Sequence, residues 1–172
     1  MMRIEVLEGE AGWPIVEALD REVWTPEVMA RVIWRDVVWA HADRRVIVRE
    51  DERVVAHAGV FHRDGKLDDR AVRLCGIGGV MTAPSARRKG YAGAAMERAA
   101  QLMADGGIDF GLLFCEPHNV KLYGKLGWRV FRGRVHCVQP SGPMIFDMMP
   151  TMIIPIAMTP EAGEIDLCGL PW

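Results

Sequence analysis

The sequence predicts an α/β (α+β) fold, with helices on the faces of a mixed, mostly antiparallel central sheet. Runs of β-branched and other apolar residues, typical of strands, lie at 3–7, 44–50, 53–63 and 70–82. Only short loops join the last three runs, so these should form an antiparallel meander. Apolar residues recur at helical spacing before and after it. Half of the 172 residues are hydrophobic, which is enough for one core, so we expect a single domain over residues 1–172.

Two helices are predicted before the meander. Apolar residues at helical spacing indicate the first over 13–24. Thr25 is a typical N-cap for the second, Pro26 suits its first position, and the pattern continues through residue 39. The tryptophans of this part fit either a core or an acceptor cleft; they are Trp24, Trp34 and Trp39.

The remaining elements alternate between the two types. Turns are expected at 51–52 and at DGKLDD (64–69), within the meander. A helix is predicted over 90–105, a buried strand over 110–115 and a short helix over 118–127. Strands at 128–133, 135–139 and 144–148 then complete the sheet.

Composition excludes several functions. The net charge of −2 argues against a nucleic-acid-binding surface, which normally makes a domain strongly basic. The four cysteines are widely spaced without a CxxC pair, so neither a zinc site nor any other metal site is expected. No signal peptide is evident, which favours a cytoplasmic protein with reduced thiols. The longest apolar tract, 148–158, contains two prolines and is too short to span a membrane.

An unusual sequence links the third meander strand to the helix at 90–105. Three glycines lie in the strand, which predicts a bulge at 78–80 or a close backbone approach to a ligand. Three cations, Arg87, Arg88 and Lys89, then precede Gly90 directly before the helix. Cations oppose the positive end of a helix dipole, so a bound anion should lie there. Unpaired N–H groups and small residues at this helix start predict a phosphate cradle.

Two motifs in this region resemble a known family. The spacing Val80-x-Thr82-x-Pro84-x-x-Arg87-x-x-Gly90-x-Ala92 resembles the acetyl-CoA signature of the GCN5-related N-acetyltransferases (GNAT). NVKLYGKLGWRVF (119–131) resembles the family's Asn-containing helix and the Leu-Gly-Trp turn after it. Neither a P-loop nor a Rossmann fingerprint is present. The resemblance covers 45–131.

The resemblance implies a cofactor site for acetyl-CoA. The pantetheine arm would run along the strand that carries the bulge, splaying it from the strand at 110–115, and a backbone N–H of Val80 or Met81 would polarise the thioester carbonyl. The residues expected to hold acetyl-CoA are Val80, Met81, Thr82, Arg87, Arg88, Lys89, Gly90, Tyr91, Ala92 and Asn119.

The chemistry requires an acid for the departing thiolate and a base for the amine. Tyr123 lies one helical turn from Asn119 and is the expected acid. The base stays open between Glu116, the two histidines of the second meander strand and, as a resemblance to the aminoglycoside 2′-N-acetyltransferases implies, the terminal carboxylate of Trp172. The histidines are His57 and His62. Cys115 is expected to be a buried strand residue, because direct attack needs no covalent intermediate.

A narrower resemblance points to the aminoglycoside 2′-N-acetyltransferases and the nodulation N-acyltransferases. It rests on VVAHAGVFHR (54–63), the helix with Leu122, Tyr123 and Gly127-Trp128, the turn VQPSGP and the C-terminal tryptophan. Gly78 departs from it, because an acidic residue is expected before the bulge, and the tail IDLCGLPW lacks most acidic residues. The expected function is acetyl transfer from acetyl-CoA to a primary amine. The alternatives are a non-catalytic acyl-CoA sensor and an enzyme for longer acyl chains, and analogy indicates a homodimer.

Overall fold

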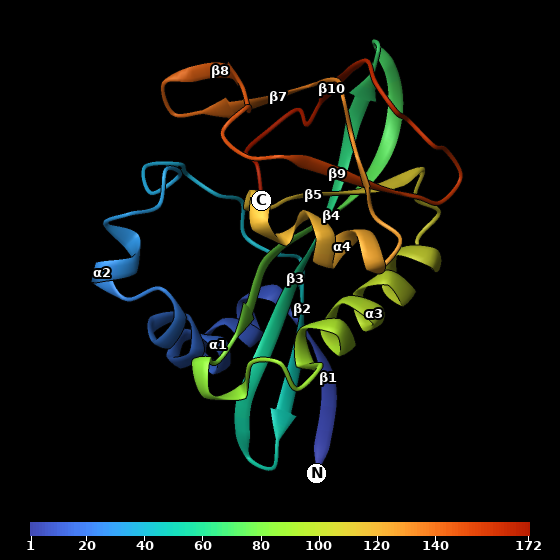
Figure 1. Ribbon diagram of the computed structural model, residues 1–172. Coiled ribbons are helices and arrows are strands. Elements are labelled where there is room, and N and C mark those ends of the chain that lie inside the picture. The colour runs from blue at the N-terminus through green and yellow to red at the C-terminus, as the bar shows by residue number, and fades with distance from the viewer.

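The computed structural model describes all 172 residues (Figure 1). Its α-helices are α1 (Gly9–Val23), α2 (Pro26–Met29), α3 (Tyr91–Ala104) and α4 (Val120–Lys125), with short 3₁₀ helices η1 (Pro84–Ala86) and η2 (Pro117–Asn119). Its strands are β1 (Met2–Glu8), β2 (Arg44–Glu50), β3 (Arg53–Leu67), β4 (Arg70–Thr82), β5 (Phe110–Phe114), β6 (Arg129–Val130), β7 (Arg134–Gln139), β8 (Gly142–Ile145), β9 (Thr151–Pro155) and β10 (Glu164–Asp166).

All ten strands belong to one sheet, in the order β6-β9-β5-β4-β3-β10-β7-β8, with β2 and then β1 also attached to β3. The long strand β3 pairs with β2 along its first half and with β10 at its end. Only β4–β5 and β10–β7 are parallel pairs. The predicted mixed, mostly antiparallel sheet with flanking helices is confirmed.

Both faces of the sheet are covered where β2 runs. Residues 45–48 are consecutive and all buried, and because successive strand residues point to opposite faces, each face must be packed. Helix α1 covers one face: a Cβ on Gly12 would lie 3.1 Å from Cδ of Arg45. Helix α3 covers the other face (Figure 1). A second apolar core, which contains Trp172, lies between the central strands and the C-terminal segments.

The predicted bulge and splay are both present in β4. Gly59 pairs with Gly78 and His57 pairs with Met81, so β4 has one extra residue between these pairs. Gly79 takes the positive φ of 56° that this bulge requires. Pairing of β4 with β5 ends at Ile77, whereas β5 continues along β9. Beyond Ile77, β4 therefore has no partner on that side.

Three predictions for the helices and the meander are wrong in detail. The second helix ends at Met29 rather than near residue 39. The segment after it is irregular and is held by edge-to-face contacts of Trp34 with Trp24 and with Trp39. Helix α1 begins at Gly9, four residues early, because a glycine there lets the helix approach the backbone of Ala42. Strand β3 runs through most of the turn expected at 64–69, and the chain reverses at residues 68–69.

The C-terminal strands differ most from the prediction. β9 and β10 are absent from it, and β8 lies at Gly142–Ile145 rather than at 144–148. The two prolines of the apolar tract at 148–158 sit at the edges of β9: Pro150 precedes it and Pro155 is its last residue, where a missing N–H costs little. β9 is an interior strand between β5 and β6, so its apolar tract is core.

Candidate active site

The loop before α3 has the geometry of an anion site. Arg88 and Gly90 both have positive φ, 66° and 86°, which turns the backbone sharply into the helix. The first helical bond runs from Ala94 N–H to the Gly90 carbonyl, so the N–H groups of residues 91–93 have no helical acceptor. A Cβ on Gly90 or Gly93 would meet nothing within 4 Å. The cradle is therefore open, and the exposed side chains of Arg87 and Arg88 make no ion pair within the chain.

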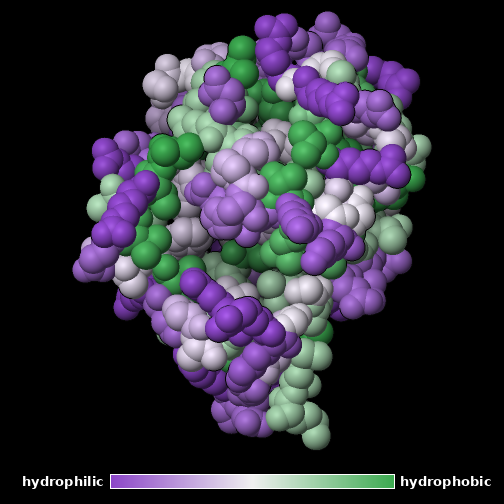
Figure 2. Space-filling model, in the orientation of Figure 1, coloured by the Kyte–Doolittle hydropathy of each residue, from purple (hydrophilic) through white to green (hydrophobic).

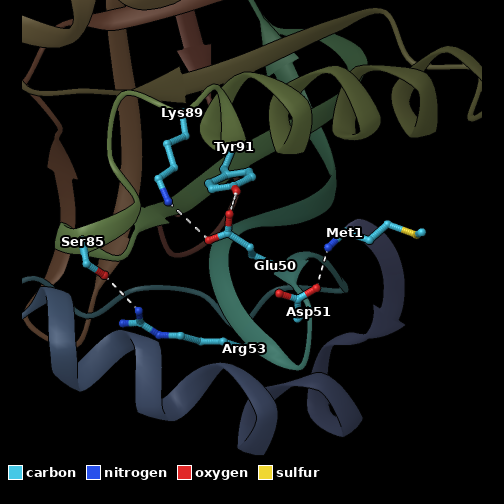
Figure 3. A network of polar contacts seen from close by, with 7 residues as sticks. All are labelled: Met1, Glu50, Asp51, Arg53, Ser85, Lys89 and Tyr91. Carbon is cyan, nitrogen blue, oxygen red and sulfur yellow. Dashed lines mark hydrogen bonds and ion pairs between the residues drawn. The ribbon is translucent and has the colours of Figure 1, made fainter.

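Lys89 and Tyr91 bind protein groups instead of facing this opening (Figure 3). The Tyr91 hydroxyl donates to a Glu50 carboxylate oxygen over 2.5 Å, and Lys89 Nζ lies 3.4 Å from the other oxygen. The hydrogen bond from Tyr91, then the charge of Lys89, lower the pKa of Glu50. On the same side, Arg53 Nη1 donates to Ser85 Oγ over 2.9 Å. These contacts attach the loop to the β2–β3 hairpin and hold its shape.

The backbone of β4 after the bulge presents amides to the open side. Ala83 N–H donates to the Val55 carbonyl of β3. Because amide directions alternate along a strand, Met81 N–H also faces β3, and Thr82 N–H faces away from it. Of the two amides expected to reach the thioester, Met81 is thus turned inward. Val80 remains the candidate donor.

Asn119 and Tyr123 lie on the other side of the opening, at the end of β5. Asn119 is half-buried, and its side chain makes no hydrogen bond within the chain. Tyr123 is buried, and burial, then the nearby thiol of Cys115, raise the pKa of its phenol. Its hydroxyl also lacks a partner, yet no polar side-chain atom is both buried and unpaired, so the hydroxyl reaches solvent. A protonated phenol that reaches solvent suits the role of an acid.

Trp172 folds back to the centre of the sheet, where Figure 1 shows the C-terminus beside the start of α4. Its indole Nε1 donates to the Leu112 carbonyl over 3.1 Å, and its ring stacks on Phe61 at 6.0 Å between centroids. Its carboxyl carbon lies 2.8 Å from where a Cβ on Gly78 would be. The carboxyl group thus stands beside the bulge, where a side chain on Gly78 would project.

Glu116 lines a separate cavity of about 270 Å³. Trp34 Nε1 donates to Glu116 Oε1 over 3.0 Å, which leaves the second carboxylate oxygen free of protein donors. Figure 2 shows the surface hollowed between the lobe that contains α2 and the middle of the molecule. The cavity is lined by Glu27, Val28, Arg31, Val32, Ile33 and Glu116.

The histidines are poor candidates for the base. His57 is 1% exposed, and burial lowers its pKa to about 4. Its Nδ1 lies 2.7 Å from the Gly79 carbonyl and its Nε2 3.3 Å from Arg45 Nη1, so both nitrogens are occupied. His62 is exposed, and its ring lies 3.9 Å from an Asp43 carboxylate oxygen. Burial, then the charge of Glu116, raise the pKa of Cys115 to about 11, so this thiol is not a nucleophile at neutral pH.

Sequence reasoning missed two contributors to this site. Arg45 is buried although it is charged, and it contacts His57 behind the bulge. Trp34 orients Glu116 from a segment predicted to be helical. No local pattern signals either contact, because each joins residues that are distant in sequence or on neighbouring strands.

The family follows from these features and from one match. Residues 9–131, well over half of the chain, match the Acetyltransferase (GNAT) domain. The protein belongs to this family and is a GNAT N-acetyltransferase, as the two motifs predicted. No helix in the structure is long and apolar enough to cross a membrane.

Solved structures of other GNAT proteins have the same fold. The ribosomal-protein-S18-alanine N-acetyltransferase of Escherichia coli is 18% identical, with a TM-score of 0.58 over 94% of this chain and 97% of that one. Escherichia coli YhbS, solved with CoA, is 14% identical, with a TM-score of 0.63 over 98% of this chain and 89% of that one. A Brucella melitensis GNAT acetyltransferase, solved with acetyl-CoA, is 11% identical, with a TM-score of 0.64 over 96% of this chain and 94% of that one. No curated protein matches the sequence.

Proposed function

We propose that this enzyme transfers the acetyl group of acetyl-CoA to a primary amine by direct attack on the thioester. The observation that carries the proposal is the divergence of β4 from β5 directly at the bulge. It leaves the backbone after the bulge without a protein partner on the side away from β3, next to the open anion cradle. A pantetheine arm would complete β4 as an added strand, with its pyrophosphate on the N–H groups of residues 91–93.

Two sets of groups would hold the cofactor. Arg87, Arg88, Gly90 and Ala92 would bind the pyrophosphate, while Val80, Thr82 and Asn119 would bind the arm. The Met81 N–H and the side chains of Lys89 and Tyr91 keep a supporting role, because they already face or bind β2 or β3, whereas the backbone N–H of Tyr91 stays part of the cradle. That two relatives of this fold were solved with CoA or acetyl-CoA supports the assignment.

The proton transfers are assigned to Trp172 and Tyr123. The Trp172 carboxylate takes a proton from the bound ammonium, and the free amine then attacks the thioester carbon. The C–S bond breaks, and the Tyr123 hydroxyl gives its proton to the CoA thiolate. The attacking nitrogen loses its second proton to solvent, solvent returns a proton to the phenolate, and the Trp172 carboxyl group releases its proton, so that one proton is released overall. A base is needed because an alkylamine with a pKa near 10 is almost entirely protonated at neutral pH.

The cavity beside α2 is the proposed acceptor site, and its chemistry fits a cationic amine. Glu116 offers an oxygen that no protein donor occupies, and Glu27 adds a second carboxylate against the single cation of Arg31. The apolar walls come from Val28, Val32 and Ile33. Here Glu116 binds the acceptor rather than abstracting its proton. The narrower resemblance to aminoglycoside 2′-N-acetyltransferases makes aminoglycosides one class of acceptor to test, although no family match supports that subgroup.

A thiol-release assay separates the proposal from its alternatives. The purified protein is mixed with acetyl-, butyryl- and palmitoyl-CoA and a panel of an aminoglycoside, a polyamine and a short peptide, and binding of each CoA is measured by calorimetry. Release with acetyl-CoA and at least one amine is expected. Turnover only with the longer chains would establish the N-acyltransferase alternative. Tight binding without turnover of any amine would establish the sensor.

A further inference from the structure

His57 lies directly behind the β4 bulge in a single protonation state. The Gly79 carbonyl, 2.7 Å from Nδ1, can only accept a hydrogen bond, so Nδ1 carries the proton. The Arg45 guanidinium, 3.3 Å from Nε2, can only donate, so Nε2 offers its lone pair. Both partners therefore select the same neutral tautomer.

The carbonyl that His57 holds belongs to the peptide unit that contains the Val80 amide. In a trans peptide the C=O and the N–H point in opposite directions within one plane. The Gly79 carbonyl points toward His57 on the α1 face and toward β3, so the Val80 N–H points away from His57. That direction leads to the side where β4 has no partner after Ile77. Because His57 holds the Gly79 carbonyl at 2.7 Å, it also fixes the direction of the Val80 N–H, which points the opposite way within the same peptide plane.

We infer that His57 is a positioning residue that aims the Val80 N–H at the thioester carbonyl of the bound acyl-CoA. The inference rests on the proposed function. Gly79 alone would not fix this direction, because a glycine at φ 56° in a bulge has unusual rotational freedom. A donor that is already aimed stabilises the developing oxyanion without reorganisation during the reaction.

Arg45 anchors His57 to α1. Its Nε donates to the Gly9 carbonyl over 2.8 Å, and its guanidinium lies 4.9 Å from the centre of the Trp13 ring. Asp20 of the same helix faces this charge. The chain of contacts from α1 through Arg45 and His57 to Gly79 is buried, so the peptide plane is fixed by packing as well as by one hydrogen bond.

The test compares CoA with acetyl-CoA, because only acetyl-CoA carries the carbonyl that Val80 should bind. His57→Phe keeps a ring and removes the donor, whereas His57→Asn places Nδ2 where Nδ1 lies. His62→Phe, on the exposed end of the same strand, is the matched control. Dissociation constants for both ligands are measured by calorimetry, and kcat and KM with an active amine.

Wild type should bind acetyl-CoA roughly 3- to 10-fold more tightly than CoA, the value of about one hydrogen bond. In His57→Phe this preference should approach one, with CoA affinity unchanged within about twofold. Loss of a single oxyanion donor lowers kcat by 10²–10³-fold, and a misaimed one should lower it at least about 10-fold. His57→Asn should restore most of the preference for acetyl-CoA and most of kcat, and His62→Phe should match wild type in both measurements.

A folded His57→Phe that keeps the acetyl-CoA preference and kcat would overturn the inference. If that variant does not fold, the wild-type protein decides: the Val80 amide proton should shift downfield in NMR with acetyl-CoA and not with CoA, and equal shifts would refute the role. Failure of wild type to bind either ligand would instead refute the proposed function.

Discussion

The indole of Trp172 fills the space that a side chain on Gly76 would need. A Cβ at Gly76 would overlap the indole atoms Cε2 and Nε1, and one at Gly78 would press on the carboxyl group. Two of the three glycines in β4 therefore admit the C-terminal residue, and only Gly79 forms the bulge. The sequence indicated a close approach at these glycines but not that a residue of the same chain makes it.

Gly76→Ala should destabilise the protein by displacing this indole. Overfilling a packed core typically costs 1–3 kcal/mol, and we expect a loss of unfolding free energy of about that size in urea denaturation. Gly124→Ala is the control, because a Cβ there meets nothing within 4 Å and α4 gains helix propensity, worth about 1 kcal/mol. Equal stability of Gly76→Ala and wild type would show that the indole does not require this space.

Gly90→Val should abolish acetyl-CoA binding while leaving the fold intact. A β-branched residue at φ 86° is strained, and its side chain would enter the open cradle that the pyrophosphate needs. Gly142→Val is matched in strain, since Gly142 has φ 119° and open space in the β7–β8 turn, far along the chain from the cradle. Calorimetry should show at least a roughly 10-fold weaker Kd for Gly90→Val only. Unchanged affinity would place the pyrophosphate elsewhere.

The local elements could be predicted because their signals lie within the elements themselves. β2 and β4 have their predicted bounds, since β-branched and other apolar residues are concentrated within each strand and turn-forming residues flank it. The cradle is also local: a cation run, Gly90 and a helix of small residues are adjacent in sequence. β9, however, is identified only by its pairing with the neighbouring strands β5 and β6, which the sequence does not show.

The parts of the site that could not be predicted depend on distant contacts. The pair Gly76–Trp172, the bond from Trp34 to Glu116 and the contact of Arg45 with His57 each require the assembled fold. From the sequence alone, a histidine in a strand can equally be a general base or a buried residue of the core. Only its buried position, with both nitrogens occupied, excludes the base and reveals the contact with the bulge.

His57 should make stability fall as the pH is lowered. The pKa of His57 in the folded protein is about 4, below the ordinary value near 6.5, because it is buried and faces Arg45, whose charge Asp20 offsets in part. Above pH 6.5 the residue is neutral in both states. Between pH 6.5 and 4 only the unfolded state binds the proton, so stability should drop by up to about 1.4 kcal/mol per pH unit, about 3 kcal/mol in total.

Urea denaturation across this pH range measures the effect, with His57→Asn as the control that lacks the titrating group. The difference in stability between the two proteins should narrow from pH 7 to pH 4. A constant difference would mean that His57 does not take up a proton on unfolding in this range.

Extending the chain with two glycines after Trp172 should remove the proposed base. The added peptide bond replaces the carboxylate near Gly78, so kcat for an alkylamine should fall by roughly 10²–10⁴-fold at pH 7. An amine of pKa below 6 is already neutral at this pH, and both proteins should acetylate it at similar rates. A deficit of the same size with both amines would indicate lost packing rather than a lost base.

Tyr123→Phe should slow the chemical step without changing the fold. The substitution removes one hydroxyl and keeps the buried ring, and that hydroxyl makes no hydrogen bond within the chain, so stability should change by less than about 1 kcal/mol. Acetyl-CoA binding should also survive, because backbone groups and Asn119 would hold the arm. With no acid for the thiolate, kcat should fall by roughly 10²–10⁴-fold on an amine for which chemistry limits turnover.

Single-turnover measurements isolate that step, and an acyl donor with a more acidic thiol, which needs no proton to depart, should restore much of the rate. If Tyr123→Phe instead turns over acetyl-CoA at the wild-type rate, Tyr123 has only a packing role and solvent protonates the thiolate.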